Sequence, residues 1–294
     1  MTSRYWFSVD SDDLHHHPSI SGHPTRSKIT PWCLDLDPRP MSNTLIHSFK
    51  SLEKWWINRR DDEKLTIFVI AEQFEDPHFI DAINSLQNSR PGLRIGIHGL
   101  KHICWSAWGD RSEEFNSAIS ESLRIIQTFA GDSFRPWFRA PGGYIAPWMI
   151  PILKNQGITL DSSINPVWLL RKKSGKNKNG KVNGWQRVRN ELIKNQIIER
   201  EWLSKNGMPT NGPALHIPLL RSHSKWVWKR KLSNLQCSND LELLDPSIPI
   251  VSIYWHVLDH SRQGGWTPPL PYTSAKSSRS ISIPNSFFVD SNNE

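Results

Sequence analysis

The sequence predicts an α/β protein built on a parallel sheet, either open or closed into a barrel. Short apolar runs rich in β-branched and aromatic residues recur along the chain, as buried strands require. Amphipathic helical patterns with recognisable ends lie between these runs. Strands that alternate with helices over 294 residues indicate one large α/β core. We therefore expect a single domain over 1–294.

The predicted strands share an apolar character and a length of only a few residues. In chain order they are 5–9, 65–70, 93–97, 136–140, 158–160, 214–220 and 248–255. Each has the composition of a buried parallel strand.

The first two predicted helices follow from apolar side chains at helical intervals. Residues 43–56 repeat such side chains every three or four positions. Residues 76–86 begin with Asp76 as a cap and Pro77 at the first helical position. Both segments should place one face against the sheet.

A third helix is predicted over 110–131. Asp110 and Glu113 have capping-box spacing, and Gly131 provides the end of the helix.

A glycine- and asparagine-rich basic stretch at 171–181 has the composition of a solvated loop, and it lies within a basic insertion around 169–212.

Composition limits the class of protein. Apolar residues make up 37% and charged residues 22%, as in a folded globular protein. The flat faces of the 15 tryptophans are suited to packing against sugar rings. No apolar run has the length of a signal peptide or a membrane span, and the 3 cysteines are scattered. These features predict a cytoplasmic protein. The net charge of +8 suits an anionic partner, but no nucleic-acid motif is present.

Histidines and aspartates follow the predicted strands, where α/β folds place their chemistry. His98 comes directly after the strand at 93–97, and one helical turn would put His102 on the same side. Asp10 and Asp12 follow the first strand. One carboxylate and two imidazoles form a zinc-type set with an open position for water. The alternatives are an ordinary histidine pair and a solvated acidic turn.

Other strand ends carry further polar groups. The segment "WFRAPGGY" contains Arg139 and two glycines, which let backbone amides approach an oxyanion. His256 ends the last apolar run, where a buried core histidine is the alternative. The three histidines at 15–17 indicate a loop near the site.

Taken together, "LTIFVIAEQF", "RIGIHGLKH", "WFRAPGGYIAPWMIPILKNQGITLDSSINP" and "IVSIYWH" resemble the polysaccharide deacetylases in order and separation. The resemblance covers residues from about 5 to 260. It implies a distorted (β/α) barrel of about seven parallel strands of the NodB-homology type. It also implies a metal-dependent hydrolase that removes an acetyl group from an N-acetylated sugar. Zn²⁺ is the expected metal, with Co²⁺ or Mn²⁺ as alternatives.

The resemblance also implies roles for individual residues. It makes Asp12, His98 and His102 the metal ligands. Among the catalytic groups, it makes Asp10 the general base, Arg139 the residue that orients this base, Gly142 the oxyanion donor through its backbone amide, His256 the general acid, and Asp161 a support for His256.

Two points depart from the family pattern. The usual first motif has adjacent aspartates, whereas this chain offers two separated pairs, Asp10 with Asp12 and Asp35 with Asp37. We favour the first pair. Many members have tyrosine at the position of Gly142, a change that a main-chain donor tolerates.

Location and charge bear on the substrate. A cytoplasmic enzyme cannot reach extracellular chitin, so we expect the substrate to be a lipid- or nucleotide-linked glycan precursor. The positive net charge suits a phosphate-linked substrate or an anionic membrane surface. Two alternatives remain open: an amide hydrolase of a small non-carbohydrate metabolite, and a non-catalytic sugar-binding relative.

Overall fold

The structure of the protein is a computed structural model that describes residues 3–29, 36 and 39–262. The strands follow the chain in this order: β1 (Arg4–Asp10), β2 (Leu65–Val69), β3 (Leu93–Ile97), β4 (Phe134–Phe138), β5 (Leu160–Asp161), β6 (Ile198–Glu199), β7 (Ser204–Lys205), β8 (Met208–Pro209), β9 (Gln236–Cys237) and β10 (Ile250–His256). The α-helices are α1 (Asn43–Ile57), α2 (Pro77–Ser89), α3 (Ser112–Ala130), α4 (Met149–Asn155), α5 (Trp185–Lys194), α6 (Pro218–Lys231) and α7 (Asp240–Leu244).

The main sheet is parallel and has the strand order β10-β1-β2-β3-β4-β5-β6, with β9 paired to the start of β1. A further bridge joins Trp202, just after β6, to Ser252 of β10. Leu203 N donates to Ser252 O at 2.9 Å in the same region. This contact brings the two edges of the sheet together, so the strands curl into a distorted (β/α) barrel, as predicted.

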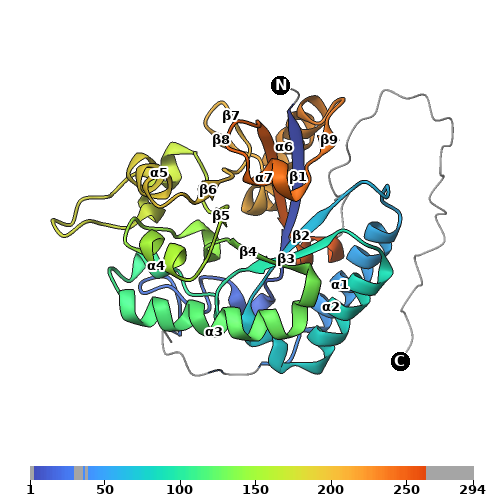
Figure 1. Ribbon diagram of the computed structural model, residues 1–294, viewed down its shortest axis with the longest axis horizontal. Coiled ribbons are helices and arrows are strands. Elements are labelled where there is room, and N and C mark those ends of the chain that lie inside the picture. The colour runs from blue at the N-terminus through green and yellow to red at the C-terminus, as the bar shows by residue number, and fades with distance from the viewer. Residues whose placement is uncertain (1–2, 30–35, 37–38, 263–294) are drawn as a thin grey trace.

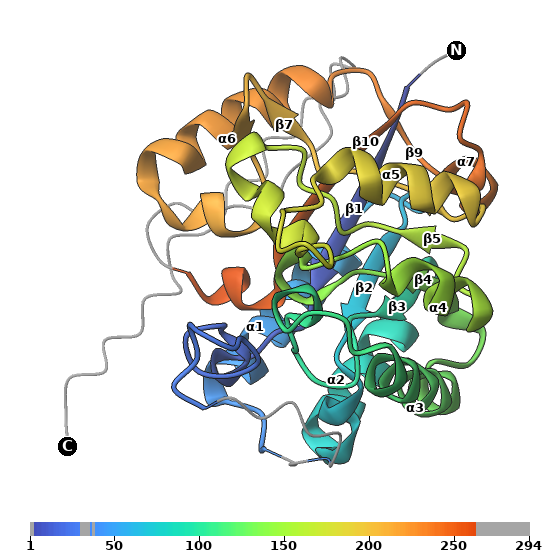
Figure 2. The same ribbon diagram turned by 90° about the vertical axis from the view of Figure 1, so that its left-hand side faces the viewer.

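Helices cover the outside of the strands (Figures 1 and 2). Every residue of β2 and β3 is buried, and because successive side chains point to opposite faces of the sheet, both faces of these strands are covered. The apolar face predicted on α2 is confirmed by the buried side chains of Phe79, Ile83 and Leu86. Asp76 caps α2 by accepting a hydrogen bond from His78 N, as predicted.

The predicted strand at 214–220 is wrong. This segment forms a 3-10 helix at Gly212–His216 and then the first turn of α6, with Pro218 at the first helical position. Proline has no N–H for a sheet ladder, and its fixed φ suits the first turn of a helix. The apolar run alone could not separate the two structures.

The predicted capping box of the third helix is also wrong. The N-cap of α3 is Arg111, whose side chain makes no capping hydrogen bond. Asp110 instead accepts a hydrogen bond from the Ser112 hydroxyl at 2.6 Å. The predicted end at Gly131 is confirmed, with φ at 50°.

The segment at 169–212 contains more than a surface insertion. Helix α5 lies within it, and β6 pairs in parallel with β5, so this part of the chain contributes to the barrel.

Among the helices of the described residues, none combines the length and the apolar character that crossing a bilayer requires.

Candidate metal centre

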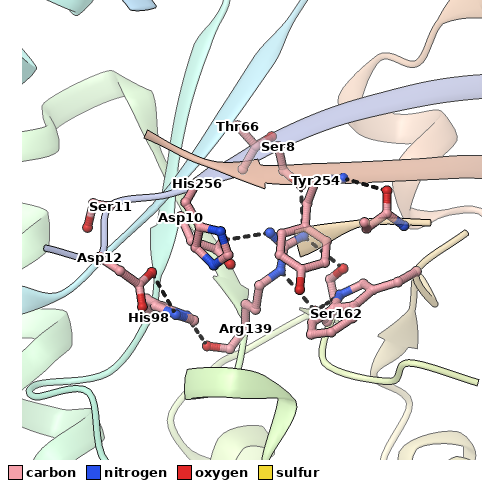
Figure 3. Close-up of polar contacts among 12 residues, drawn as sticks. Ser8, Asp10, Ser11, Asp12, Thr66, His98, Arg139, Ser162, Tyr254 and His256 are labelled. Carbon is pink, nitrogen blue, oxygen red and sulfur yellow. Dashed lines mark hydrogen bonds and ion pairs between the residues drawn. The ribbon is translucent and has the colours of Figure 1, made fainter. Parts of the chain in front are cut away.

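Five polar side chains meet where the parallel strands end (Figure 3). Asp10 ends β1 and lies beside His256, the last residue of β10, in the sheet register. His98 follows β3 directly, and Arg139 follows β4. Asp12 lies two residues beyond β1. The sheet therefore brings together residues that are far apart in the sequence.

Asp12 contacts both histidines of the "HGLKH" segment. Its Oδ1 lies 2.7 Å from His102 Nε2, and its Oδ2 lies 3.5 Å from His98 Nε2. One ligand atom of each residue lies within 4.8 Å of the others, and all three residues are buried. Two imidazoles and one carboxylate in this arrangement match the donor set of a zinc-type ion.

The hydrogen bonds of His98 favour a cation at this point. The carbonyl of Arg139 can only accept, so His98 Nδ1 donates to it at 2.8 Å. In the neutral ring the lone pair is then on Nε2, which faces the Asp12 carboxylate. Asp12 Oδ2 is buried and has no hydrogen-bond donor among the described residues. Two acceptors that face each other in this way fit a shared metal ion.

The pKa values of these groups agree with this donor set. Burial lowers the pKa of His98, which keeps the imidazole neutral as a metal ligand requires. Burial alone would raise the pKa of Asp12. Contact with the His102 and His98 imidazoles outweighs burial and holds the pKa of Asp12 well below its usual range.

Arg139 lies under this group and pairs with Asp10. Its guanidinium donates to Asp10 Oδ1 at 2.6 Å, to the Ser8 hydroxyl at 2.7 Å and to the Ser162 carbonyl at 3.0 Å. The side chains of Arg139 and Asp10 are 1% and 4% exposed. The buried guanidinium fixes the position of the Asp10 carboxylate.

His256 lies on the other side of Asp10, and the three side chains of Asp10, Asp12 and His256 form a second group of close ligand atoms. His256 Nδ1 lies 3.6 Å from Asp259 Oδ2, and its backbone N–H donates to the same oxygen at 2.9 Å. Burial lowers the pKa of His256, but Asp259 and the carboxylates of Asp12 and Asp10 raise it to about 9. The imidazole is therefore protonated at neutral pH.

The expected contact between Asp161 and His256 is absent from the described structure, and the carboxylate that contacts His256 is that of Asp259. Asp161 instead accepts a hydrogen bond from the Ser163 hydroxyl at 2.7 Å and shares another with Glu199. Burial and the charge of Asp161 raise the pKa of Glu199 well above its usual value. Two carboxyl groups in contact cannot both ionise, so Glu199 carries the shared proton.

The turn after Arg139 requires both of its glycines. Gly142 and Gly143 have φ angles of 58° and 73°, which side chains with a Cβ rarely adopt. A Cβ on Gly143 would lie 2.9 Å from the Trp202 ring. Ser163 ties this turn to Asp161, because its hydroxyl accepts from Ala140 N at 2.8 Å.

Lys173 also reaches the turn, from the stretch predicted to be a solvated loop. Its ammonium donates to the Gly142 carbonyl at 2.6 Å, and burial lowers its pKa to about 8. This part of the loop is therefore packed against the site.

The loop after β1 supports the centre. The Asp13 carboxylate accepts from the Ser42 backbone N–H at 2.7 Å, which ties the loop to the start of α1. The ring of His16 lies 6.0 Å from that of His102, so the 15–17 histidines lie near the site, as predicted. Asp35 and Asp37, the alternative first pair, lie outside the described residues.

Several residues around the site were not identified from the sequence. Asp259 stands three positions after His256, a capping-box spacing that could have revealed it. Ser8 and Ser162 had no comparable signal, because only the folded sheet brings them to Arg139.

No protein-family model and no curated protein matches the chain. Among solved structures, a provisionally assigned polysaccharide deacetylase of Mycobacterium smegmatis aligns with a TM-score of 0.50 at 15% identity, over 90% of this chain and 79% of that chain. A 4-alpha-glucanotransferase of Thermococcus litoralis has a TM-score of 0.44 at 12% identity, over 87% of this chain and 34% of that chain. A CE4 esterase of Streptococcus mutans has a TM-score of 0.37 at 11% identity, over 87% and 75%. The likeness to the mycobacterial protein shows a common fold.

Proposed function

We propose that the protein is a divergent polysaccharide deacetylase, a metal-dependent hydrolase that removes an acetyl group from the nitrogen of an N-acetylated sugar. The single observation that carries this proposal is the convergence of Asp12, His98 and His102 beside Asp10 and His256. The fold shared with the mycobacterial protein agrees with it.

The proposed metal ligands are Asp12, His98 and His102, and the donor set favours Zn²⁺ over Co²⁺ or Mn²⁺. When bound, such an ion lowers the pKa of a water ligand and polarises the carbonyl of the amide. The remaining chemistry belongs to side chains and backbone of the chain.

In this mechanism Asp10 accepts a proton from the attacking water, because Arg139 aims its carboxylate through the bond of 2.6 Å. The backbone N–H of Gly142 donates to the oxygen that becomes negative as the carbonyl is attacked. The protonated His256 then donates its proton to the departing amine, and Asp259 stabilises the imidazolium until that step. One ionised and one protonated group predict a bell-shaped pH profile.

Metal analysis tests the ligand assignment. We expect wild-type protein to hold one divalent ion, and Asp12→Ala to lose it. Asp37→Ala, from the alternative pair, should keep it and serves as the matched control. Retention of the ion by Asp12→Ala with loss in Asp37→Ala would reverse the assignment of the first motif.

Acetate release tests the reaction. The metal-loaded protein should release acetate from N-acetylated sugars, including lipid-linked and nucleotide-linked ones, and Asp10→Asn should abolish release. Release only from N-acetylated amines without a sugar ring would favour the small-metabolite alternative. Binding of sugars without any release would favour the non-catalytic one.

A further inference from the structure

The segment 202–239 is basic and has no acidic side chain. It contains six lysines and arginines and no aspartate or glutamate. The chain has 36 basic residues in total, so the remaining 30 nearly balance its 28 acidic residues. Most of the net charge of +8 therefore belongs to this one segment, which includes β7, β8 and α6.

Helix α6 lies on the outside of the barrel, beside β7 (Figure 2), and has an inner and an outer side. Val227 and Trp228 are buried on the inner side. Leu219 and Trp226, by contrast, are 84% and 47% exposed. These two residues are seven positions apart, which is about two helical turns, so both lie on the outer side. The outer side of α6 thus presents large apolar side chains that the core does not use.

A hollow lies between α6 and β7. Its volume is about 320 Å³, and it is lined by Lys205, Trp226, Val227, Arg230 and Lys231. No carboxylate is among the described lining residues. The Arg230 guanidinium lies over the Trp226 ring, 4.9 Å from its centroid. Sites for small ligands begin at about 300 Å³, so the hollow has room for a phosphate group and the atoms esterified to it.

The residue types around the hollow distinguish between anionic partners. Lysine and arginine attract any polyanion, but tryptophan is typical of the boundary between water and lipid. Exposed apolar side chains extend this pattern, because Ile217 and Leu219 lie at the start of α6 and Met208 lies opposite Lys205 in the β7–β8 pair. Such side chains gain little from a nucleic-acid backbone, whereas they can enter the acyl boundary of a bilayer.

We propose that this surface docks the protein on membranes that contain anionic phospholipids, with a headgroup phosphate in the hollow. The docking surface consists of Lys205, Met208, Leu219, Trp226, Arg230 and Lys231. Its cations face the negative headgroups, and its apolar side chains enter the boundary between headgroups and acyl chains. Docking itself does not depend on the deacetylase reaction.

The apolar end of the docking surface is close to the candidate metal centre. His216 lies two residues before α6, and its ring centroid is 6.0 Å from that of His256. Docking would therefore bring the centre to the membrane. In so far as the proposed function holds, this position favours N-acetylated sugars that are linked to a membrane lipid.

Co-sedimentation with vesicles tests the docking without any turnover. The protein is mixed with vesicles of phosphatidylcholine alone, or of equal parts of phosphatidylcholine and phosphatidylglycerol. We expect the mixed vesicles to bind the protein at least about tenfold more tightly, because only they carry negative charge. High salt should weaken this binding, since it screens exposed charges.

Substitution of the three cations tests where the membrane binds. The triple variant Lys205→Gln, Arg230→Gln and Lys231→Gln should bind the mixed vesicles about a hundredfold more weakly, because each basic residue near an anionic surface contributes a factor of about five. The matched control replaces three exposed lysines elsewhere, Lys50, Lys154 and Lys178, by glutamine. It lowers the net charge equally and should stay within about threefold of wild type.

Substitution of Trp226 tests the apolar part of the surface. Trp226→Ala should weaken binding to the mixed vesicles by about tenfold. Trp168→Ala is the matched control, because Trp168 is 63% exposed and has the Arg171 guanidinium 4.2 Å from its ring centroid. It should bind as wild type does. All the substituted side chains lie at the surface, so the unfolding temperature of each variant should match that of wild type.

Equal binding by the triple variant and its matched control would overturn the inference. Equal binding of wild type to neutral and anionic vesicles would overturn it as well. Binding to double-stranded DNA through the same three cations, without binding to vesicles, would make the partner a nucleic acid instead. None of these measurements uses acetate release, so a failure of the proposed function would leave their outcomes unchanged.

Discussion

Replacing Asp259 by asparagine should move the alkaline limit of activity to lower pH. Asp259 Oδ2 lies 3.6 Å from His256 Nδ1, and the pKa of His256 rises from 6.5 to about 9 despite a burial that opposes the rise. At about 1.36 kcal/mol for each pKa unit, this rise corresponds to about 3 kcal/mol in favour of the protonated ring.

Asp259 opposes the effect of burial most strongly, through the approach of its carboxylate to Nδ1 and through its negative charge. The contribution of Asp12 shrinks when a cation neutralises its carboxylate. We therefore expect Asp259→Asn to remove at least half of the increase, so that the pKa of His256 falls by about 1 to 2. The protonated ring is the active form in the proposed mechanism, so activity should be lost as pH rises through this pKa.

The assay is kcat/KM for acetate release between pH 5 and pH 10. Wild type should keep its activity until about pH 9, where His256 loses its proton. Asp259→Asn should begin to lose activity at about pH 7 to 8. When each protein is normalised to its own kcat/KM at pH 6, the variant should be about tenfold less active than wild type at pH 9. Asp81→Asn, an exposed carboxylate on α2, is the control. If kcat/KM of Asp259→Asn falls at the same alkaline pH as that of wild type, the role of Asp259 is refuted, and with it the assignment of His256 as the acid.

Three further changes should have distinct effects. Arg139→Gln leaves the buried Asp10 carboxylate without its partner. It should lower the free energy of unfolding by about 3 to 5 kcal/mol and lower kcat by at least about a hundredfold. A wild-type kcat in this variant would contradict the role of the pair. Gly143→Ala should cost about 1 to 3 kcal/mol of stability, because φ is 73° and a Cβ meets the Trp202 ring; unchanged stability would show that the turn relaxes freely. Chelation should lower the unfolding temperature of wild type but leave that of Asp12→Ala unchanged, and an equal loss in both would place the ion elsewhere.

Much of the barrel follows from local patterns in the sequence. The strands at 93–97 and 65–70 are buried from end to end, so their apolar runs identify them within a residue or so. The segment at 214–220 has a similar apolar character but is helical, because Pro218 cannot join a sheet ladder and fits the start of α6. Hydrophobicity alone does not separate a short buried strand from a helix end.

The candidate ligand group was predictable for a related reason. Asp12 lies two residues after β1, and His98 and His102 lie in the loop after β3, so both loops are at the edge of the barrel where parallel strands end. The partner of His256 was less accessible to sequence reasoning. Asp161 is the last residue of β5 and Asp259 lies in the turn after β10, so only the folded chain decides which carboxylate reaches the imidazole.

The most direct test of the account is a diffraction experiment on crystals of the zinc-loaded protein, recorded at the zinc absorption edge. We predict an anomalous peak at about 2.0 to 2.2 Å from one carboxylate oxygen of Asp12 and from the Nε2 atoms of His98 and His102. A peak held by Asp35 or Asp37 instead of Asp12, or a fully loaded protein with no peak at the two histidines, would contradict it.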